Sequence, residues 1–132
     1  MQSGIARQMA NKWPPLESAY DSVCLSRLME PGRFFVWGGL TPEVPLIFNL
    51  GTQRNPGADA KLVWISMALA NCFDFMEERG LETLAIPRIG CGVGGLKWED
   101  VSKVLTVVAS QTTVELTVVT LPEKETSESE RT

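Results

Sequence analysis

The fold is decided by the stretch Leu84-Ala-Ile-Pro-Arg-Ile-Gly-Cys-Gly-Val-Gly-Gly-Leu-Lys-Trp-Glu-Asp100. Its first three residues suit a short buried strand, and Pro87 ends regular pairing because proline has no N–H to donate. Four glycines follow within six residues, so the backbone can take positive φ angles and bring its N–H groups close to a ligand. Apolar residues at helical spacing begin after Leu96. The stretch therefore predicts a strand, a glycine-rich loop and the start of a helix.

A glycine-rich loop that feeds a helix N-terminus suits an anion, usually a phosphate, because unpaired N–H donors and a partial positive charge gather there. The plain alternative is a tight turn between strand and helix. Gly90 to Gly95 also satisfies the G-x-G-x-x-G pattern of dinucleotide-binding folds. Only one strand, 114–121, follows the loop, so a full mononucleotide-binding half cannot be built from it, and Glu123 is a weak candidate for a ribose partner. A P-loop is excluded because no Gly-Lys-Ser/Thr follows at the required spacing.

Length and composition describe one ordinary globular domain. The 132 residues are enough for a single core, and 44% hydrophobic and 21% charged residues are usual values for such a domain. The net charge of −4 argues against a non-specific nucleic-acid or membrane surface, although it leaves room for a small anion pocket. Without a signal-like or long apolar segment, we expect a soluble, cytoplasmic protein with no membrane partner.

The chain has no histidine, which removes the commonest general base and the commonest metal ligand. We therefore expect no Ser-His or Cys-His mechanism. We also expect no metal and no cofactor. Three widely spaced cysteines suit a reducing compartment. Cys91 lies inside the glycine loop and is a candidate nucleophile, but without a base partner the role of a small buried residue is favoured.

Hydrophobic spacing predicts how the rest of the chain is organised. Pro14 and Pro15 should stop the first helix, and Asp59 should cap the long helix that ends near Gly80. Strand–helix units repeat after residue 44, which predicts an α/β fold with helices flanking a sheet. The expected helices are 5–13, 16–29, 62–79 and a fourth after residue 96, and the expected strands are 33–37, 46–50, 84–86 and 114–121.

The loops at the ends of two of these strands should form the site. Residues 51–57 and 89–96 both follow buried strands, and ligands of open α/β sheets lie at such carboxyl ends. We expect these two loops to meet the turn Ser3–Ile5 at one rim. Residues 122–132 are too polar to pack and are predicted to form a disordered tail after a domain of residues 1–121.

Three stretches together resemble macrodomains. They are Ser-Gly-Ile-Ala-Arg-Gln-Met-Ala-Asn-Lys-Trp-Pro at 3–14, Ile-Phe-Asn-Leu-Gly-Thr-Gln-Arg at 47–54 and Ile-Pro-Arg-Ile-Gly-Cys-Gly-Val-Gly-Gly-Leu-Lys-Trp at 86–98. They are most similar to the branch that holds the terminal ADP-ribose glycohydrolase and the antitoxin that removes ADP-ribose from DNA. The resemblance covers residues 1–121 and implies a three-layer α/β/α sandwich around a mixed sheet. It implies binding of ADP-ribose, free or attached to protein or nucleic acid.

The resemblance also implies which residues contact the ligand. Residues of the first loop would lie near the distal ribose and the diphosphate, and those of the second loop would wrap the diphosphate with backbone N–H groups. The end of the last strand would approach the adenine. The implied ligand-binding residues are Ser3, Gly4 and Ile5, then Thr52 and Gln53, then Ile89, Gly90, Cys91, Gly92, Val93, Gly94, Gly95 and Leu96, and finally Leu121.

The chain departs from the family pattern in three ways. The resemblance implies two strands before Met1, one of them in the middle of the sheet, so we expect an N-terminally incomplete fold whose open strand edges could pair with another copy. In the glycohydrolase branch a catalytic lysine takes the place of Gln53 and a catalytic acid the place of Gly94.

Two classes of function therefore stay open. The chain could bind ADP-ribose without turnover, or it could hydrolyse an ADP-ribosyl bond or the phosphate ester of ADP-ribose-1″-phosphate with other groups. The catalytic residues of such a hydrolase are unknown. If the scaffold is otherwise competent, Gln53→Lys together with Gly94→Asp should raise turnover.

Overall fold

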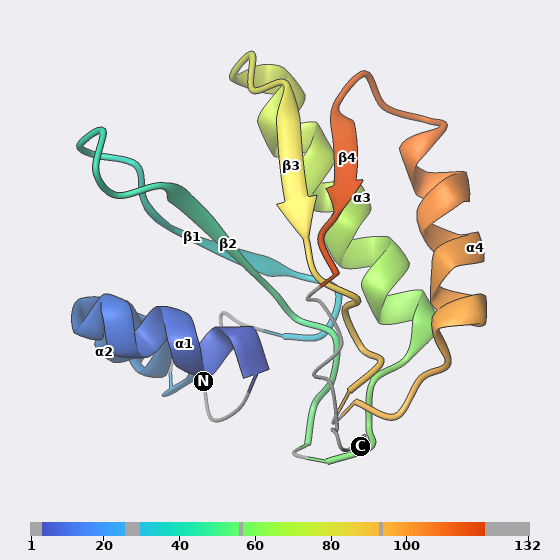
Figure 1. Ribbon diagram of the computed structural model, residues 1–132, viewed down its shortest axis with the longest axis horizontal. Helices are drawn as coiled ribbons and strands as arrows, with labels where there is room; N and C mark the ends of the chain where they lie inside the picture. The colour runs from blue at the N-terminus through green and yellow to red at the C-terminus, as the bar shows by residue number, and fades with distance from the viewer. Residues whose placement is uncertain (1–3, 26–29, 56, 93, 121–132) are drawn as a thin grey trace, which may run out of the picture.

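The computed structural model describes residues 4–25, 30–55, 57–92 and 94–120, with the side chains of 4–6 and 23–25 left aside. This part of the chain forms four helices and four strands (Figure 1). In order they are α1 (Gly4–Lys12), α2 (Pro14–Leu25), β1 (Phe34–Gly38), β2 (Leu46–Leu50), α3 (Leu62–Glu78), β3 (Thr83–Ile86), α4 (Trp98–Ala109) and β4 (Glu115–Val118). The α/β class expected from the sequence is confirmed.

The strands form two separate two-stranded sheets. β1 and β2 are an antiparallel hairpin with Phe34 opposite Leu50, and β3 and β4 pair in parallel with Thr83 opposite Glu115. The hairpin diverges from the β3–β4 pair, so that β2 and β3 face each other across a gap in the ribbon (Figure 1). Among the described residues no strand joins β2 to β3, so the sheet is not continuous.

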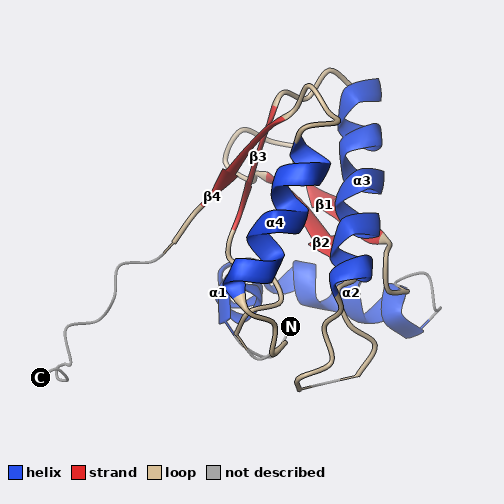
Figure 2. Ribbon diagram, turned by 90° about the vertical axis from the view of Figure 1, so that its right-hand side faces the viewer, coloured by secondary structure: helices blue, strands red, loops and turns tan. Residues whose placement is uncertain are grey.

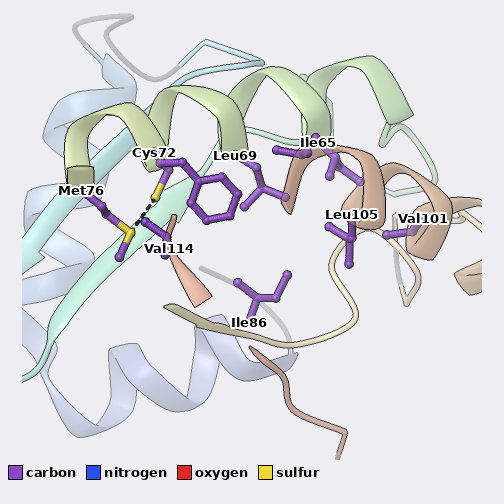
Figure 3. Close-up of a cluster of buried hydrophobic side chains, with 10 residues drawn as sticks. Ile65, Leu69, Cys72, Met76, Ile86, Val101, Leu105 and Val114 are labelled. Atoms are coloured by element: carbon purple, nitrogen blue, oxygen red, sulfur yellow. Dashed lines mark hydrogen bonds between the residues drawn. The ribbon is translucent and has the colours of Figure 1, made fainter. Parts of the chain in front are cut away.

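Helices cover both sides of the strands. α3 and α4 lie together and share a core with β3, and α3 also contacts β1 and β2. α1 and α2 lie together beneath the hairpin, where α2 contacts β1 (Figures 1 and 2). The main core fills the space between α3, α4 and β3 (Figure 3). Its buried members are Ile65, Leu69, Cys72, Phe73, Met76, Ile86, Val101, Leu105, Val108 and Val114. The apolar faces predicted for α3 and α4 are therefore confirmed.

The N-terminal helices are fixed to each other and to the hairpin by side chains. The guanidinium of Arg7 donates two hydrogen bonds, of 3.0 and 2.9 Å, to the carboxylate of Glu17, which links α1 to α2. The rings of Trp13 and Trp37 lie 6.5 Å apart, which joins this helical pair to β1. Pro14 and Pro15 form the first turn of α2, where a missing N–H costs nothing, so α2 begins earlier than expected.

Other element ends differ by a few residues. β1 begins at Phe34 and runs to Gly38, and β4 is limited to Glu115–Val118. The predicted tail 122–132 lies outside the described residues, and so does Leu121. No helix of the described part of the chain has both the length and the apolar character needed to cross a membrane.

Candidate functional site

Two loops meet at the rim where β2 and β3 end. The backbone N–H of Ala60 donates a 3.2 Å hydrogen bond to the carbonyl of Gly94, and the N–H of Lys61 donates one of 3.2 Å to the carbonyl of Thr52. Residues 51–61 are thereby held against residues 89–96. The first hydrogen bond joins the segment 51–61 to the glycine loop, and the second closes the segment 51–61 on itself. The contact between the two segments is therefore made by Ala60, just beyond the loop 51–57 that was expected to make it.

The glycine loop is closed on itself and packed against its neighbour. The N–H of Leu96 donates a 2.8 Å hydrogen bond to the carbonyl of Gly90, and Gly90 and Gly95 have φ angles of 77° and 85°. A Cβ on Gly94 would lie 2.7 Å from the carbonyl oxygen of Gly90 and 2.9 Å from the Cβ of Ala60. Glycine is required at position 94 because backbone atoms leave no room for a side chain.

Backbone N–H groups are the main hydrogen-bond donors of this loop. The N–H groups of Gly90, Gly92 and Gly94 donate to no backbone carbonyl of the described residues. Gly92 is exposed, and a Cβ built on it would meet no atom within 4 Å. The loop therefore offers donors beside open space, as an anion site requires.

The first turn of α4 is a poorer anion site than the sequence suggested. Glu99 and Asp100 both lie in that turn, and their carboxylates complement the positive end of the helix dipole. Lys97 occupies the N-cap position and makes no side-chain cap hydrogen bond. An anion would therefore be held by the loop donors ahead of the helix, with Lys97 as the neighbouring cation.

The loop 51–57 is braced from within by two side chains. The amide nitrogen of Gln53 donates to the carbonyls of Asn55 and Gly57, at 2.6 and 3.0 Å. One carboxylate oxygen of Asp59 accepts hydrogen bonds from the N–H groups of Arg54 and Asn55, at 2.9 and 2.8 Å. These hydrogen bonds, from Asn55 first and then Arg54, lower the pKa of the Asp59 carboxyl. The charged carboxylate of Asp59 therefore holds the backbone of this loop in place.

Asp59 is not the cap of α3, contrary to the sequence prediction. The N-cap position belongs to Lys61, which makes no side-chain cap hydrogen bond, and the helix begins at Leu62. A capping carboxylate must lie directly before the first helical residue. Asp59 lies two residues before the N-cap position, and its carboxylate accepts hydrogen bonds from the loop instead.

Cys91 is not arranged as a nucleophile. Its thiol lies 3.6 Å from the carbonyl oxygen of Ile89, and partial burial raises its pKa although the nearby charge of Arg88 acts in the opposite direction. The guanidinium of Arg88 lies 4.9 Å from the ring centre of Trp98. A thiol with a raised pKa and no base beside it favours the structural role expected for Cys91.

The two loops border a groove of about 770 Å³ that runs up between β2 and β3. Thr52, Ile89 and Gly90 line its end at the loops, together with Asn49 of β2 and Met9 of α1. Asn49 and Met9 were not among the site residues expected from the sequence. A polar residue within the apolar run of β2 was the available signal for Asn49, whereas Met9 was counted only as part of an apolar helix face.

The remaining predicted site residues fall into two groups. Ser3, Val93 and Leu121 lie outside the described residues. Gly4 and Ile5 belong to the first turn of α1, so they do not form the separate turn that was expected. Of the others, Thr52, Ile89 and Gly90 line one groove, and Gln53 follows Thr52 and bonds within its own loop. The glycine loop also holds Cys91, Gly92, Gly94, Gly95 and Leu96.

The polar groups of the two loops define what this site presents to a ligand. It offers backbone donors, an amide already used within its loop, and a thiol with a raised pKa. In the described part of the chain, no three Cys, Asp or Glu side chains gather in a way that could hold a metal ion. Acid–base catalysis would need a titratable group that reaches the ligand.

Comparison with known proteins identifies the family. The family model of the Macro domain matches residues 1–105. A DNA ADP-ribosyl glycohydrolase of Mycobacterium tuberculosis is 32% identical over 104 residues, which are 78% of this chain and 30% of that protein. The human ADP-ribose glycohydrolase OARD1 is 43% identical over 44 residues, 33% of this chain and 29% of that protein. The chain thus spans about a third of the length of the curated relatives that it matches.

Solved structures agree with this assignment. The macrodomain of Mycobacterium tuberculosis DarG has a TM-score of 0.81 at 29% identity, covering 93% of this chain and 82% of that chain. The macrodomain of Thermus aquaticus DarG has a TM-score of 0.77 at 25% identity, covering 92% of this chain and 82% of that chain. The chain belongs to the macrodomain family.

Proposed function

We propose that this chain binds ADP-ribose, free or attached to a macromolecule, with the diphosphate held by the loop 89–96. The observation that carries the proposal is the set of N–H groups of Gly90, Gly92 and Gly94, which donate to no backbone carbonyl of the described residues. A diphosphate accepts several hydrogen bonds at once, and glycines let the backbone approach it closely. Two relatives are named as glycohydrolases of ADP-ribosyl or ADP-ribose groups, and this supports the choice of ligand.

Recognition without turnover fits the side chains better than hydrolysis does. Gln53 uses its amide nitrogen within the loop, and Gly94 offers no side chain and has no space for one. Neither residue can form a Schiff base or transfer a proton. Hydrolysis of an ADP-ribosyl bond remains the second proposal, and it is favoured by one observation, the 32% identity to a DNA ADP-ribosyl glycohydrolase.

A calorimetric titration tests the binding proposal. ADP-ribose should bind with a dissociation constant in the micromolar range, about −8 kcal/mol. AMP and ribose 5-phosphate, which each lack the diphosphate, should bind at least about tenfold more weakly if the loop contacts contribute about 1.4 kcal/mol or more. Equal affinity for ADP-ribose and AMP would contradict the placement of the diphosphate in the loop.

Product analysis separates the two proposals. The protein is incubated with ADP-ribosylated DNA, with ADP-ribosylated protein and with ADP-ribose-1″-phosphate, and free ADP-ribose is measured by chromatography. Binding without turnover predicts product no faster than in a buffer control. Sustained multiple turnover on any one of the three substrates would establish the hydrolase.

A further inference from the structure

Positive charge gathers on the two segments that meet at the site. Residues 51–61 and 88–97 together contain four basic residues and one acidic residue, Asp59. The basic residues are Arg54, Lys61, Arg88 and Lys97. The whole chain has a net charge of −4, so the rest of the protein is acidic. A local excess of one sign of charge attracts ligands of the opposite sign, which here means anions.

Two of these cations have no carboxylate partner in the described part of the chain. Arg54 forms an ion pair with Glu30, with 3.2 Å between the two charged groups. Arg88 and Lys97 form no ion pair with any described residue. Glu99 and Asp100 follow Lys97 in the first turn of α4, and neither is paired with it or with Arg88. Both cations are exposed, so a ligand can reach them.

The guanidinium of Arg88 is held beside the glycine loop. It lies over the ring of Trp98, 4.9 Å from the ring centre. The hydrogen bond of 2.8 Å from the N–H of Leu96 to the carbonyl of Gly90 closes the loop and brings its two ends together. Burial raises the pKa of the Cys91 thiol, and the charge of Arg88 opposes that rise. The positive charge of Arg88 therefore acts on a group inside the loop.

Stacking on Trp98 leaves the donors of Arg88 available. An aromatic ring contacts the flat face of a guanidinium, whereas its five N–H donors point outward in the plane. No described residue accepts a hydrogen bond from this side chain. A guanidinium edge of this kind can bind two oxygens of one phosphate group. Arg88 is thus oriented by its ring contact and still able to bind an anion.

We propose that Arg88, with Lys97 beside it, forms a subsite for a third phosphate, carried by the group attached to the ADP-ribosyl unit. The inference rests on the proposed function, because it takes the diphosphate to be held by the N–H groups of the glycine loop. Two kinds of ligand carry such a phosphate, a phosphate monoester of ADP-ribose and an ADP-ribosylated nucleic acid. An ADP-ribosylated peptide without phosphate does not.

Calorimetric titrations compare ADP-ribose with three ligands that extend it. ADP-ribose-1″-phosphate carries a monoester, an ADP-ribosylated oligonucleotide carries phosphodiesters, and an ADP-ribosylated peptide of serine and glycine carries no phosphate. At least one of the two phosphate-bearing ligands should bind about tenfold more tightly than ADP-ribose, and the peptide should bind about as tightly as ADP-ribose. A gain for the monoester alone or for the oligonucleotide alone would identify which phosphate the subsite accepts.

Variants of the protein test whether Arg88 makes the difference. In Arg88→Gln the gain from the third phosphate should fall to about twofold or less, whereas Arg88→Lys keeps the charge and should keep part of the gain. Lys103→Gln is the matched control, because it removes one positive charge from an exposed position of α4 outside the two segments. It should keep the full gain. Equal losses in Arg88→Gln and Lys103→Gln would show an effect of net charge and overturn the subsite.

The titrations separate this inference from the proposed function. Binding of ADP-ribose with no gain from either phosphate-bearing ligand would overturn the subsite and leave the proposed function standing. A gain for the peptide equal to that for the oligonucleotide would also overturn the subsite, because the peptide has no phosphate. If ADP-ribose itself did not bind, the proposed function would be wrong and the subsite with it.

Discussion

Ala60 and Gly94 are joined by a hydrogen bond of 3.2 Å from the N–H of the first to the carbonyl of the second. The same two residues are also in steric contact, because a Cβ on Gly94 would lie 2.9 Å from the Cβ of Ala60. The shape of the glycine loop therefore depends on Ala60, which lies just before α3 in the chain, whereas the glycine loop comes after α3 and β3. This contact joins the segment 51–61 to the loop 89–96 at one edge of the molecule.

The first prediction concerns the stability of that rim. Gly94→Ala should lower the free energy of unfolding by about 1–3 kcal/mol, because the new methyl group is forced against backbone atoms. Gly92→Ala is the matched control, since the space around Gly92 is empty, and it should change stability by less than about 0.5 kcal/mol. Urea denaturation measures both, and equal effects at the two positions would contradict the packing described here.

The second prediction concerns Asp59. Its folded-state pKa is lowered, so the charged carboxylate contributes stability above the ordinary aspartate pKa, and this contribution is lost as pH falls through the lower folded value. Asp59→Ala should therefore be less stable than the wild type at pH 7, and the difference should shrink as the pH falls below about 3.9.

Denaturation curves of the two proteins at several pH values test this. A separate titration compares affinity for ADP-ribose, which Asp59→Ala should weaken. Asp74→Ala, an exposed change on α3, is the control and should leave that affinity unchanged. A stability difference between wild type and Asp59→Ala that grows at acid pH would be evidence against the role of the carboxylate.

The third prediction concerns the double variant that was expected to raise turnover if the scaffold is otherwise competent. Gln53→Lys combined with Gly94→Asp places a side chain where the carbonyl oxygen of Gly90 lies 2.7 Å from the new Cβ. The double variant should lose thermal stability and gain no glycohydrolase activity. Gln53→Lys alone is the control and should fold. Efficient release of ADP-ribose by the double variant would show that the loop can rearrange around Gly94.

The fourth prediction uses the cysteines as reporters, in a Cys24→Ser background. Burial raises the pKa of Cys72 to about 12, so it should react with iodoacetamide only when the protein unfolds. Cys91 is half-buried in the loop and should react slowly in the native protein. Saturating ADP-ribose should slow labelling of Cys91 and leave Cys72 unaffected, as followed by mass spectrometry. Unchanged labelling of Cys91 would place the ligand elsewhere.

Much of the fold could be predicted because its signals are local. The apolar spacing from Leu62 to Met76 identified α3, and the run 46–50 gave the bounds of β2 correctly. Four glycines after a buried strand likewise identified the loop at Gly90 to Gly95. Each of these inferences depends on residues that are close together in the chain.

Features that depend on distant residues were not accessible in this way. The sequence around Asp59 is that of a helix cap, and only the position of Lys61 at the N-cap shows why Asp59 turns to the loop. The steric limit at Gly94 comes from two neighbours, the carbonyl oxygen of Gly90, which the fold of the loop brings within 2.7 Å, and the Cβ of Ala60, which is far away in sequence. The groove between β2 and β3 depends on how two sheets diverge, and no short pattern encodes that angle.

The central claim is that the diphosphate of ADP-ribose lies against Gly92. The direct test compares Gly92→Asp with Gly92→Asn in calorimetric titrations with ADP-ribose, because the two side chains have nearly the same size and differ in charge. Both variants should fold, since the position is open. The aspartate should weaken binding by at least about tenfold more than the asparagine, as a like charge beside the diphosphate costs about 1.4 kcal/mol or more. Equal affinities for the two variants would contradict the placement of the diphosphate in this loop.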